Sequence, residues 1–271
     1  AGELVLECLK SGCKRILLTL GGSATNDGGC GLFCALGARF LRKNGEAFVP
    51  TGLTLEEIDS IDISGVAGAF FSCFFTVAAD VKNTLLGEAG ATYTYAPQKG
   101  ALPGDLEKME RGMEHYASLL FRESGVRVAE LPSSGAAGGM AAPVMAFGRC
   151  EVRSGAEAVL SAKGFYSEAK DADLVLTGEG SLDGQSLYGK TAGAAADFCR
   201  KENIPIYAVC GAFKDSEGLR ERFAKILTVE ALAENRDDSV KNASRYLEAL
   251  GALAAIDVMS GAVKTEGRDA Q

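Results

Sequence analysis

A glycine-rich segment carrying hydroxyl, amide and carboxylate side chains runs from residue 21 to residue 29 of this 271-residue chain. It follows the apolar run Arg15 to Leu20, which predicts a buried strand, and a helical pattern resumes after it. Such a turn at a strand end lets backbone N–H groups approach an anion closely. We expect a site for phosphate or hydroxyl groups, with Asp27 binding Mg²⁺ or accepting a proton. The alternative is a tight turn whose Asn-Asp pair caps the helix. The binding residues expected in this loop are Gly22, Ser23, Thr25 and Asn26.

A second segment, from Thr177 to Thr191, combines glycines with two carboxylates, an amide and a lysine between a predicted strand and a predicted helix. Phosphoryl transfer needs a cation near the phosphates and carboxylates that hold Mg²⁺. We expect Lys190 to supply the cation, and Glu179 and Asp183 to be the metal ligands. The alternative is a long surface loop with a charged rim. The candidate binding residues of this segment are Gly178, Glu179 and Gln185.

The stretch from Gly184 to Thr191 also matches the pattern G-x-x-x-x-G-K-[ST] of P-loop nucleotide hydrolases. A P-loop starts directly at the end of a strand, whereas residues 178–183 are expected to intervene here. The sequence also shows no second predicted strand that ends in an acidic residue suited to bind the Mg²⁺ of a P-loop. The P-loop interpretation is therefore the alternative and not the leading hypothesis.

A third polar patch follows the apolar run 70–79, which predicts a strand ending at Asp80. Asn83 comes three residues later, and Gln98 and Lys99 lie in the next turn. Aspartates at strand ends often only cap a turn, so this patch either binds a ligand or shapes the chain. The one histidine, His115, lies off the apolar stripe of its predicted helix, which argues against a His-based triad.

The elements that position these residues predict an α/β fold. A long helix is expected to start at 103–105, and a helical pattern is expected through residues 152–160. Beyond a domain boundary near Phe165, strands at 174–177, 206–210 and 226–229 alternate with helices at 190–201, 217–223 and 238–250, which indicates a parallel sheet covered by helices. Three strands are few for a stable open sheet. The apolar periodicity is lost near the C-terminus, and we expect residues 256–271 to form a tail.

Composition excludes several classes of partner. Acidic residues number 36 against 28 basic ones, and the net charge of −8 would repel nucleic acid or an anionic membrane. The eight cysteines contain no C-x-x-C pair, which favours buried thiols in a reducing cytoplasm over a metal site or a disulfide framework. No apolar stretch is long enough to span a membrane. We expect a cytoplasmic protein without nucleic-acid or membrane partners.

Six short segments lie, in chain order, at residues 21–29, 35–40, 80–83, 97–100, 135–139 and 176–185. Together they resemble the motifs of the bacterial glycerate kinase family of the type that serves glycerate and glyoxylate metabolism. The resemblance runs from Ala1 to about Leu250, and six ordered motifs are far more specific than one glycine pattern.

The resemblance implies ATP-dependent phosphorylation of D-glycerate, most often at the 2-hydroxyl, with Mg²⁺, in a cleft between two α/β domains. One domain is Rossmann-like with a parallel sheet, and a mixed α/β domain is inserted into it. Residues 1–165 would then be the inserted domain and 166–255 the C-terminal half of the Rossmann-like one. Of the two loops, one would handle ATP-Mg²⁺ and the other glycerate. Asp27 or Asp183 would accept the proton, with Lys190 or Lys99 stabilising transferred charge. A homodimer is compatible with the family.

The chain departs from the family pattern at its start. The strand with an Asp-Ser-Phe-Lys-Gly loop that usually opens the family, and a later Asp-Gly-Gly-Glu-Gly turn, do not occur here. Roughly the first quarter of a typical member is therefore expected to be missing. This leaves a further alternative, a non-catalytic fragment that keeps the fold. Two smaller departures, Thr84 for Pro and Tyr188 for His, are expected to be tolerated.

Overall fold

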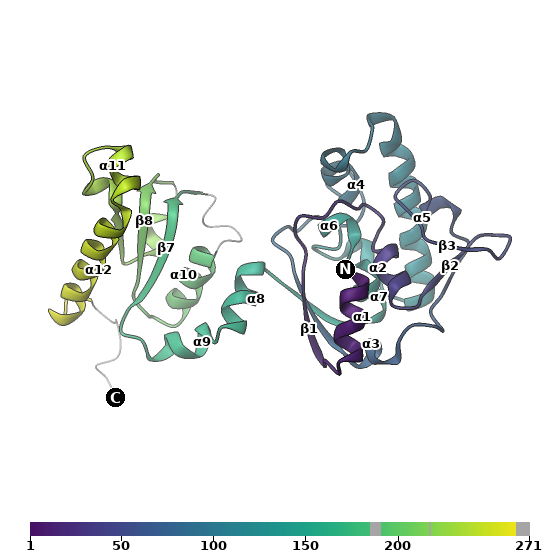
Figure 1. Ribbon diagram of the computed structural model, residues 1–271, viewed down its shortest axis with the longest axis horizontal. Coiled ribbons are helices and arrows are strands. Elements are labelled where there is room, and N and C mark those ends of the chain that lie inside the picture. The colour runs from purple at the N-terminus through teal and green to yellow at the C-terminus, as the bar shows by residue number, and fades with distance from the viewer. Residues whose placement is uncertain (185–190, 217, 264–271) are drawn as a thin grey trace. The chain divides into compact units, whose positions relative to one another are not determined.

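The computed structural model describes residues 1–184, 191–216 and 218–263. The chain divides into two compact units, Ala1–Ser154 and Gly155–Gln271 (Figure 1). The division lies earlier than the boundary expected near Phe165. The reason is that helix α8 (Gly155–Ala162) packs against α9 (Phe165–Glu168) and α10 (Thr191–Lys201) and so belongs to the second unit.

The first unit contains a parallel three-stranded sheet of order β1-β5-β6 and an antiparallel one of order β3-β2-β4. Strand β5 pairs with a neighbour on each side and buries Phe75 and Val77 completely. The strands are β1 (Arg15–Thr19), β2 (Arg39–Leu41), β3 (Ala47–Phe48), β4 (Ser60–Asp62), β5 (Phe74–Ala78) and β6 (Arg149–Arg153). The helices are α1 (Gly2–Lys10), α2 (Cys30–Ala35), α3 (Gly68–Ser72), α4 (Ala91–Tyr95), α5 (Leu106–Ser124), α6 (Ala136–Gly139) and α7 (Ala142–Phe147).

The second unit is built on a parallel sheet of order β7-β8-β9. Alternate residues of β8 face opposite sides, as expected for a strand. Ile206 and Ala208 pack in a cluster with α10, whereas Tyr207 packs with α12, so helices cover both faces (Figure 1). This confirms the expected parallel, helix-covered sheet. The strands are β7 (Val175–Leu182), β8 (Ile206–Phe213) and β9 (Lys225–Thr228), and the remaining helices are α11 (Arg236–Lys241) and α12 (Ala243–Met259).

Several predicted elements need correction. The apolar run 70–79 is not one strand, because α3 occupies its start and β5 only residues 74–78. Residues 149–153 form strand β6 instead of continuing a helical pattern. The helix expected at 217–223 is a short 3₁₀ turn at 220–222, with residue 217 outside the described residues. The predicted helix 238–250 is two helices, and α12 continues to Met259, past the expected start of the tail at 256.

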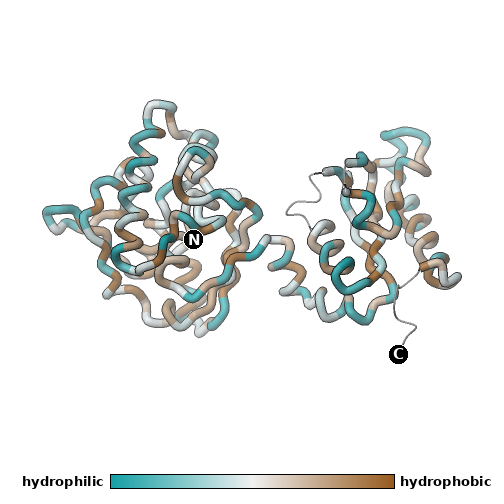
Figure 2. Tube along the Cα trace, turned by 180° about the vertical axis from the view of Figure 1, so that it is seen from behind, coloured by the Kyte–Doolittle hydropathy of each residue, from teal (hydrophilic) through white to brown (hydrophobic). Residues whose placement is uncertain are grey.

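The distribution of hydropathy follows the two units. Figure 2 shows brown, hydrophobic stretches running through the interior of each unit and teal, hydrophilic ones mainly at outer turns. Each unit has a hydrophobic core of its own. Among the described residues, the first unit has one cluster of buried apolar side chains, and the second unit has two, one on each face of its sheet. No helix in the described ranges is long and apolar enough to cross a membrane.

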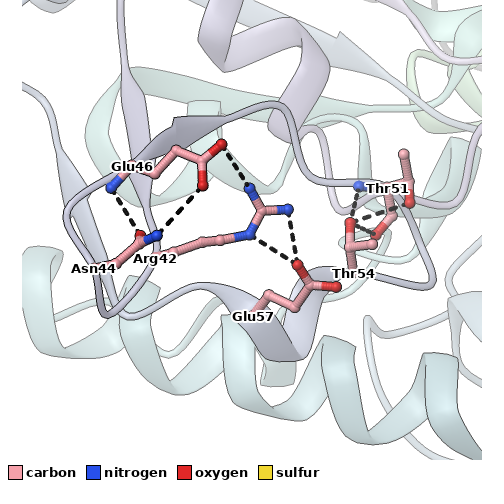
Figure 3. Close-up of polar contacts among 6 residues, drawn as sticks. All are labelled: Arg42, Asn44, Glu46, Thr51, Thr54 and Glu57. Atoms are coloured by element: carbon pink, nitrogen blue, oxygen red, sulfur yellow. Dashed lines mark hydrogen bonds and ion pairs between the residues drawn. The ribbon is translucent and has the colours of Figure 1, made fainter.

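Arg42 fastens the β2–β3 hairpin to the 3₁₀ turn at 55–57 (Figure 3). Its Nε and Nη2 donate to one oxygen of Glu57 at 2.9 and 2.8 Å, and its Nη1 lies 3.6 Å from Glu46. The guanidinium also stacks 3.9 Å from the ring centre of Phe48. Beside it, the Thr54 hydroxyl accepts from the backbone N–H of Thr51 at 2.8 Å and shapes the entry to the turn.

Replacing Arg42 by Lys is expected to lower the free energy of unfolding by about 1 kcal/mol, because an ammonium group can neither fork to Glu57 nor stack on Phe48 in the same way. The partial exposure of the pair keeps the effect small. Urea unfolding followed by circular dichroism measures it. The control is Arg111→Lys, since Arg111 makes one contact to Glu56 from a more exposed position and should change stability by less than about 0.5 kcal/mol. Equal losses in both variants would contradict the role given to Arg42.

Candidate functional site

The loop at residues 21–29 leaves β1 and is pressed against the glycine-rich turn at 135–139. The Gly28 backbone N–H donates to the Gly138 carbonyl at 3.0 Å. A Cβ atom on Gly138 would lie 2.2 Å from the Thr25 carbonyl oxygen, and the residue has a left-handed φ of 71°. Only glycine fits both constraints. The 135–139 motif therefore shapes the Asp27 loop through its backbone.

Asp27 is fixed at the start of α2. Its Oδ1 accepts from the Gly29 N–H and its Oδ2 from the Gly31 N–H, each at 3.0 Å. The capping role considered as the alternative for this loop is thus present. The half-buried carboxylate also lines a pocket of about 240 Å³ together with Thr25. Each carboxylate oxygen has a further lone pair, so capping leaves room for a hydrogen bond to a ligand.

Lys99 lies at the same loop. Its Nζ donates to the Thr25 carbonyl oxygen at 2.7 Å. Burial lowers the pKa of the Lys99 ammonium, and the negative charge of Asp27 partly offsets that shift. The structure therefore brings Thr25, Asp27 and Lys99 together from segments more than 70 positions apart in sequence. This places a carboxylate and an ammonium group near one exposed stretch of backbone.

Asn26 and Asn83 both make hydrogen bonds within the protein. Asn26 is 8% exposed and donates to the Thr92 hydroxyl at 3.4 Å. Asn83 donates to the Ala89 carbonyl at 2.7 Å and accepts from the Tyr95 hydroxyl at 2.6 Å. Both contacts hold α4, which leads directly into the turn with Lys99. Sequence reasoning missed Thr92 and Tyr95, and no pattern in the sequence distinguishes them.

The other expected residues of the first unit lie nearer the surface. Gly22 is exposed with a φ of 63°, a backbone conformation that favours glycine, and Ser23 is half-buried. Gln98 is exposed on the same turn as Lys99. Asp80 follows β5 by two residues and is exposed. The side chains of Gln98 and Asp80 are therefore accessible to solvent.

In the second unit, the segment expected to be one long loop begins as a strand. Strand β7 continues through Leu182, with Gly178 and Glu179 paired in register with Val209 and Cys210 of β8. Glu179 is therefore a strand residue, and Asp183 is the first residue past the strand end. Four residues of extended chain span about 13 Å. The two carboxylates were expected to share one metal ion, and this spacing separates them.

Two glycines explain why β7 can pass so close to β8. A Cβ atom on Gly211 would lie 2.5 Å from the Gly180 carbonyl oxygen. Past the strand, the Lys214 N–H donates to the Leu182 carbonyl at 2.9 Å and holds the end in place. Glu230, which sequence reasoning missed, accepts from the Phe213 N–H at 3.0 Å. Its position two residues after β9 was a usable signal, because acidic residues at strand ends often cap turns.

The long loop expected to precede the P-loop pattern does not form. Because β7 ends at Leu182, Gly184 lies two residues past the strand, so distance from the strand no longer argues against a P-loop. Gln185 and Lys190 lie outside the described residues. Across the ranges that are described, no three His, Cys, Asp or Glu side chains group closely enough to hold a metal ion.

Known proteins resemble this chain along most of its length. The model of the glycerate kinase family matches residues 1–258. A glycerate kinase of Halalkalibacterium halodurans is 36% identical over 91% of this chain and 67% of its own length. A glycerate 2-kinase of Escherichia coli is 39% identical over 80% of the chain and 57% of its own length. A crystal structure assigned to glycerate kinase 2 of Salmonella typhimurium LT2 superposes with a TM-score of 0.81 at 36% identity, over 96% of this chain and 68% of that one. The chain thus spans between about half and two thirds of these curated relatives.

Proposed function

Since the chain belongs to the glycerate kinase family, we propose that the protein transfers a phosphoryl group from ATP to D-glycerate and yields 2-phosphoglycerate. The position of transfer is suggested by the similarity to a relative named as a glycerate 2-kinase. The P-loop alternative predicts ATP hydrolysis without any hydroxy acid, and the family match over residues 1–258 argues against it. Free cysteines at all eight positions fit a reducing cytoplasm.

The group formed by Thr25, Asp27 and Lys99 is the observation that carries this proposal. D-glycerate combines a carboxylate with two hydroxyl groups, so its recognition needs a cation and hydrogen-bond acceptors close together. Lys99 supplies the cation, and Asp27 supplies an acceptor held in position by two backbone N–H groups. We assign glycerate to this loop.

ATP is assigned to the carboxyl end of the β7-β8-β9 sheet. Ligands of open parallel sheets bind beyond the carboxyl ends of the strands. Asp183 lies at that end and is half-buried. Gln185 and Lys190 are proposed to contact the phosphates, and the backbone of Gly178 and the side chain of Glu179 lie further back on the strand.

The available carboxylate side chains fit a magnesium ion that is bound together with ATP, which is the form that kinases use. Magnesium is commonly held by one or two carboxylates together with substrate phosphates and water. Asp183 supplies one such carboxylate, and the length of strand between it and Glu179 argues against a two-carboxylate site. When bound, the ion neutralises charge on the phosphates.

The chain's own residues then orient and deprotonate the acceptor. Asp27 accepts a hydrogen bond from the reacting hydroxyl and takes its proton as the hydroxyl oxygen bonds to the γ-phosphorus and the bond from that phosphorus to ADP breaks. Because phosphoryl transfer passes through a loose transition state, holding the hydroxyl in line matters more than the strength of the base. The two N–H contacts to Asp27 provide that fixed orientation. Lys99 and Lys190 balance the charge of the substrates.

The product identifies the reaction. The full-length gene product is incubated with ATP, Mg²⁺ and D-glycerate, and the mixture is passed to enolase with or without phosphoglycerate mutase. Enolase uses 2-phosphoglycerate directly, so we expect phosphoenolpyruvate to form without the mutase. Formation only in its presence would move the transfer to the 3-hydroxyl. No phosphorylated product at all would overturn the proposal.

Replacing Lys99 by Met is expected to raise KM for D-glycerate by about 10- to 100-fold, with a smaller change in kcat, because a charge-assisted contact worth about 1.5–3 kcal/mol is lost. Steady-state kinetics at saturating ATP measures it. Lys108→Met, which changes an exposed lysine on α5, is the control and should leave KM unchanged. If Lys99 serves only to hold the Thr25 carbonyl, its loss will lower the melting temperature and leave KM as it was.

A further inference from the structure

The end of helix α1 brings two exposed cysteines together. Gly12 adopts a φ of 83°, and its N–H donates to the Leu9 carbonyl at 3.0 Å. The Cys13 N–H donates to the Cys8 carbonyl, also at 3.0 Å. These two hydrogen bonds with a left-handed glycine define the Schellman motif, which closes helices at their C-termini.

The second hydrogen bond limits the separation of the two cysteines. From the Cys8 Cα atom to its carbonyl oxygen is about 2.4 Å, and from the Cys13 nitrogen to its Cα atom is about 1.5 Å. Added to the hydrogen bond, these lengths keep the two Cα atoms within about 7 Å at any angle, and the bends along the path bring them closer. Disulfides span Cα separations of about 4.4–6.8 Å. The backbone therefore already meets the requirement for a bond.

The motif also favours contact between the two side chains. In a Schellman motif the residues at these two positions commonly touch through their side chains. Cys73 lies next to this turn, because the backbone N–H of Phe74 donates to the Lys14 carbonyl at 2.9 Å. Burial is the main cause that raises the pKa of the Cys73 thiol, and the neighbouring thiols of Cys13 and Cys8 raise it further. Cys8 and Cys13 are exposed, and Cys73 is buried.

We propose that Cys8 and Cys13 form an oxidisable dithiol that closes to a disulfide by exchange with small-molecule disulfides. One thiolate attacks the reagent, forms a mixed disulfide and releases one small thiol. The second cysteine thiolate then attacks the protein sulfur of the mixed disulfide, forms the Cys8–Cys13 bond and releases the second small thiol. The pair loses two protons and two electrons, and the reagent is reduced to two thiols.

Trypsin separates the two cysteines and makes the bond visible. Cleavage after Lys10 and Lys14 places Cys8 and Cys13 on different peptides, so the disulfide appears as the peptide that ends at Lys10 linked to the peptide 11–14. The folded chain is equilibrated in buffers of oxidised and reduced glutathione, free thiols are blocked, and the peptides are quantified by mass spectrometry. We expect this pair to form before any other disulfide. Its effective thiol concentration should be at least about tenfold higher in the folded chain than in urea.

Two variants control the assignment. With Cys8→Ser, glutathione should remain attached to Cys13, because no second thiol displaces it. With Cys73→Ala, the Cys8–Cys13 pair should form as in the wild type. The proposal is overturned if either cysteine bonds first to Cys73, if disulfides between chains form first, or if only glutathione adducts accumulate. Equal effective concentrations in the folded chain and in urea would overturn it too.

Discussion

Asp183→Asn in the full-length protein is expected to lower kcat/KM for ATP by about 1000-fold or more while the protein keeps its stability. Asparagine has the same shape as aspartate but lacks the negative charge that, under the proposed function, would hold a magnesium ion on the ATP phosphates. Asp183 is the first residue past β7, at the end of a parallel sheet where ligands bind. The substitution should therefore weaken ATP binding and slow catalysis together.

Asp173→Asn is the matched control for this variant. Asp173 is exposed and precedes the same strand at its opposite, amino end. Initial rates at varied ATP, with saturating D-glycerate, are compared for the two variants and the wild type. We expect the control to match the wild type. If Asp183→Asn keeps its rate within about threefold, or if both variants lose the same amount, the carboxyl end of β7 is not the nucleotide site.

The second large effect is on stability. Gly138→Ala is expected to lower the free energy of unfolding by about 3–5 kcal/mol, because its new Cβ atom meets backbone that cannot move away cheaply. The atom would lie 2.2 Å from the Thr25 carbonyl oxygen and 2.7 Å from the Asn26 Cα atom. Any relief of this clash displaces the Asp27 loop, so D-glycerate turnover should fall along with stability.

Gly125→Ala separates the clash from the cost of the backbone conformation. Gly125 ends α5 with a φ of 73°, almost the same as the 71° of Gly138, but a Cβ atom added to it would meet nothing within 4 Å. Its substitution should cost about 1 kcal/mol. Urea unfolding followed by circular dichroism and tyrosine fluorescence compares the two. Similar losses would mean that the two glycine-rich turns do not press together.

The positions of the candidate loops could be predicted from the sequence, but the backbone conformation within them could be predicted less well. Both polar segments follow predicted strands, and the structure confirms strands there at β1 and β7. Glu179 was misplaced because glycines are depleted in strands, so the Gly178 to Gly184 stretch is typical of a loop. Only the close approach of Gly180 to Gly211 explains why glycine suits a strand at this point. That contact joins residues far apart in sequence.

Hydrophobic periodicity could not distinguish a helix from a strand where a run is apolar throughout. Residues 70–79 carry no alternation that distinguishes a helix from a buried strand, and the chain uses both there. Strand β6 is short and only partly buried, so its pattern was weak. Pairs such as Asn26 with Thr92, or Lys99 with Thr25, depend on tertiary packing. No local pattern in a single sequence encodes them.

Release of ADP that depends on D-glycerate is the decisive measurement for the proposed kinase activity. The full-length gene product is assayed with ATP and Mg²⁺ through coupled oxidation of NADH, with and without D-glycerate. We expect a rate that rises with D-glycerate to saturation, well above the rate with ATP alone. A rate that is the same with and without D-glycerate would refute the assignment of D-glycerate as the phosphoryl acceptor.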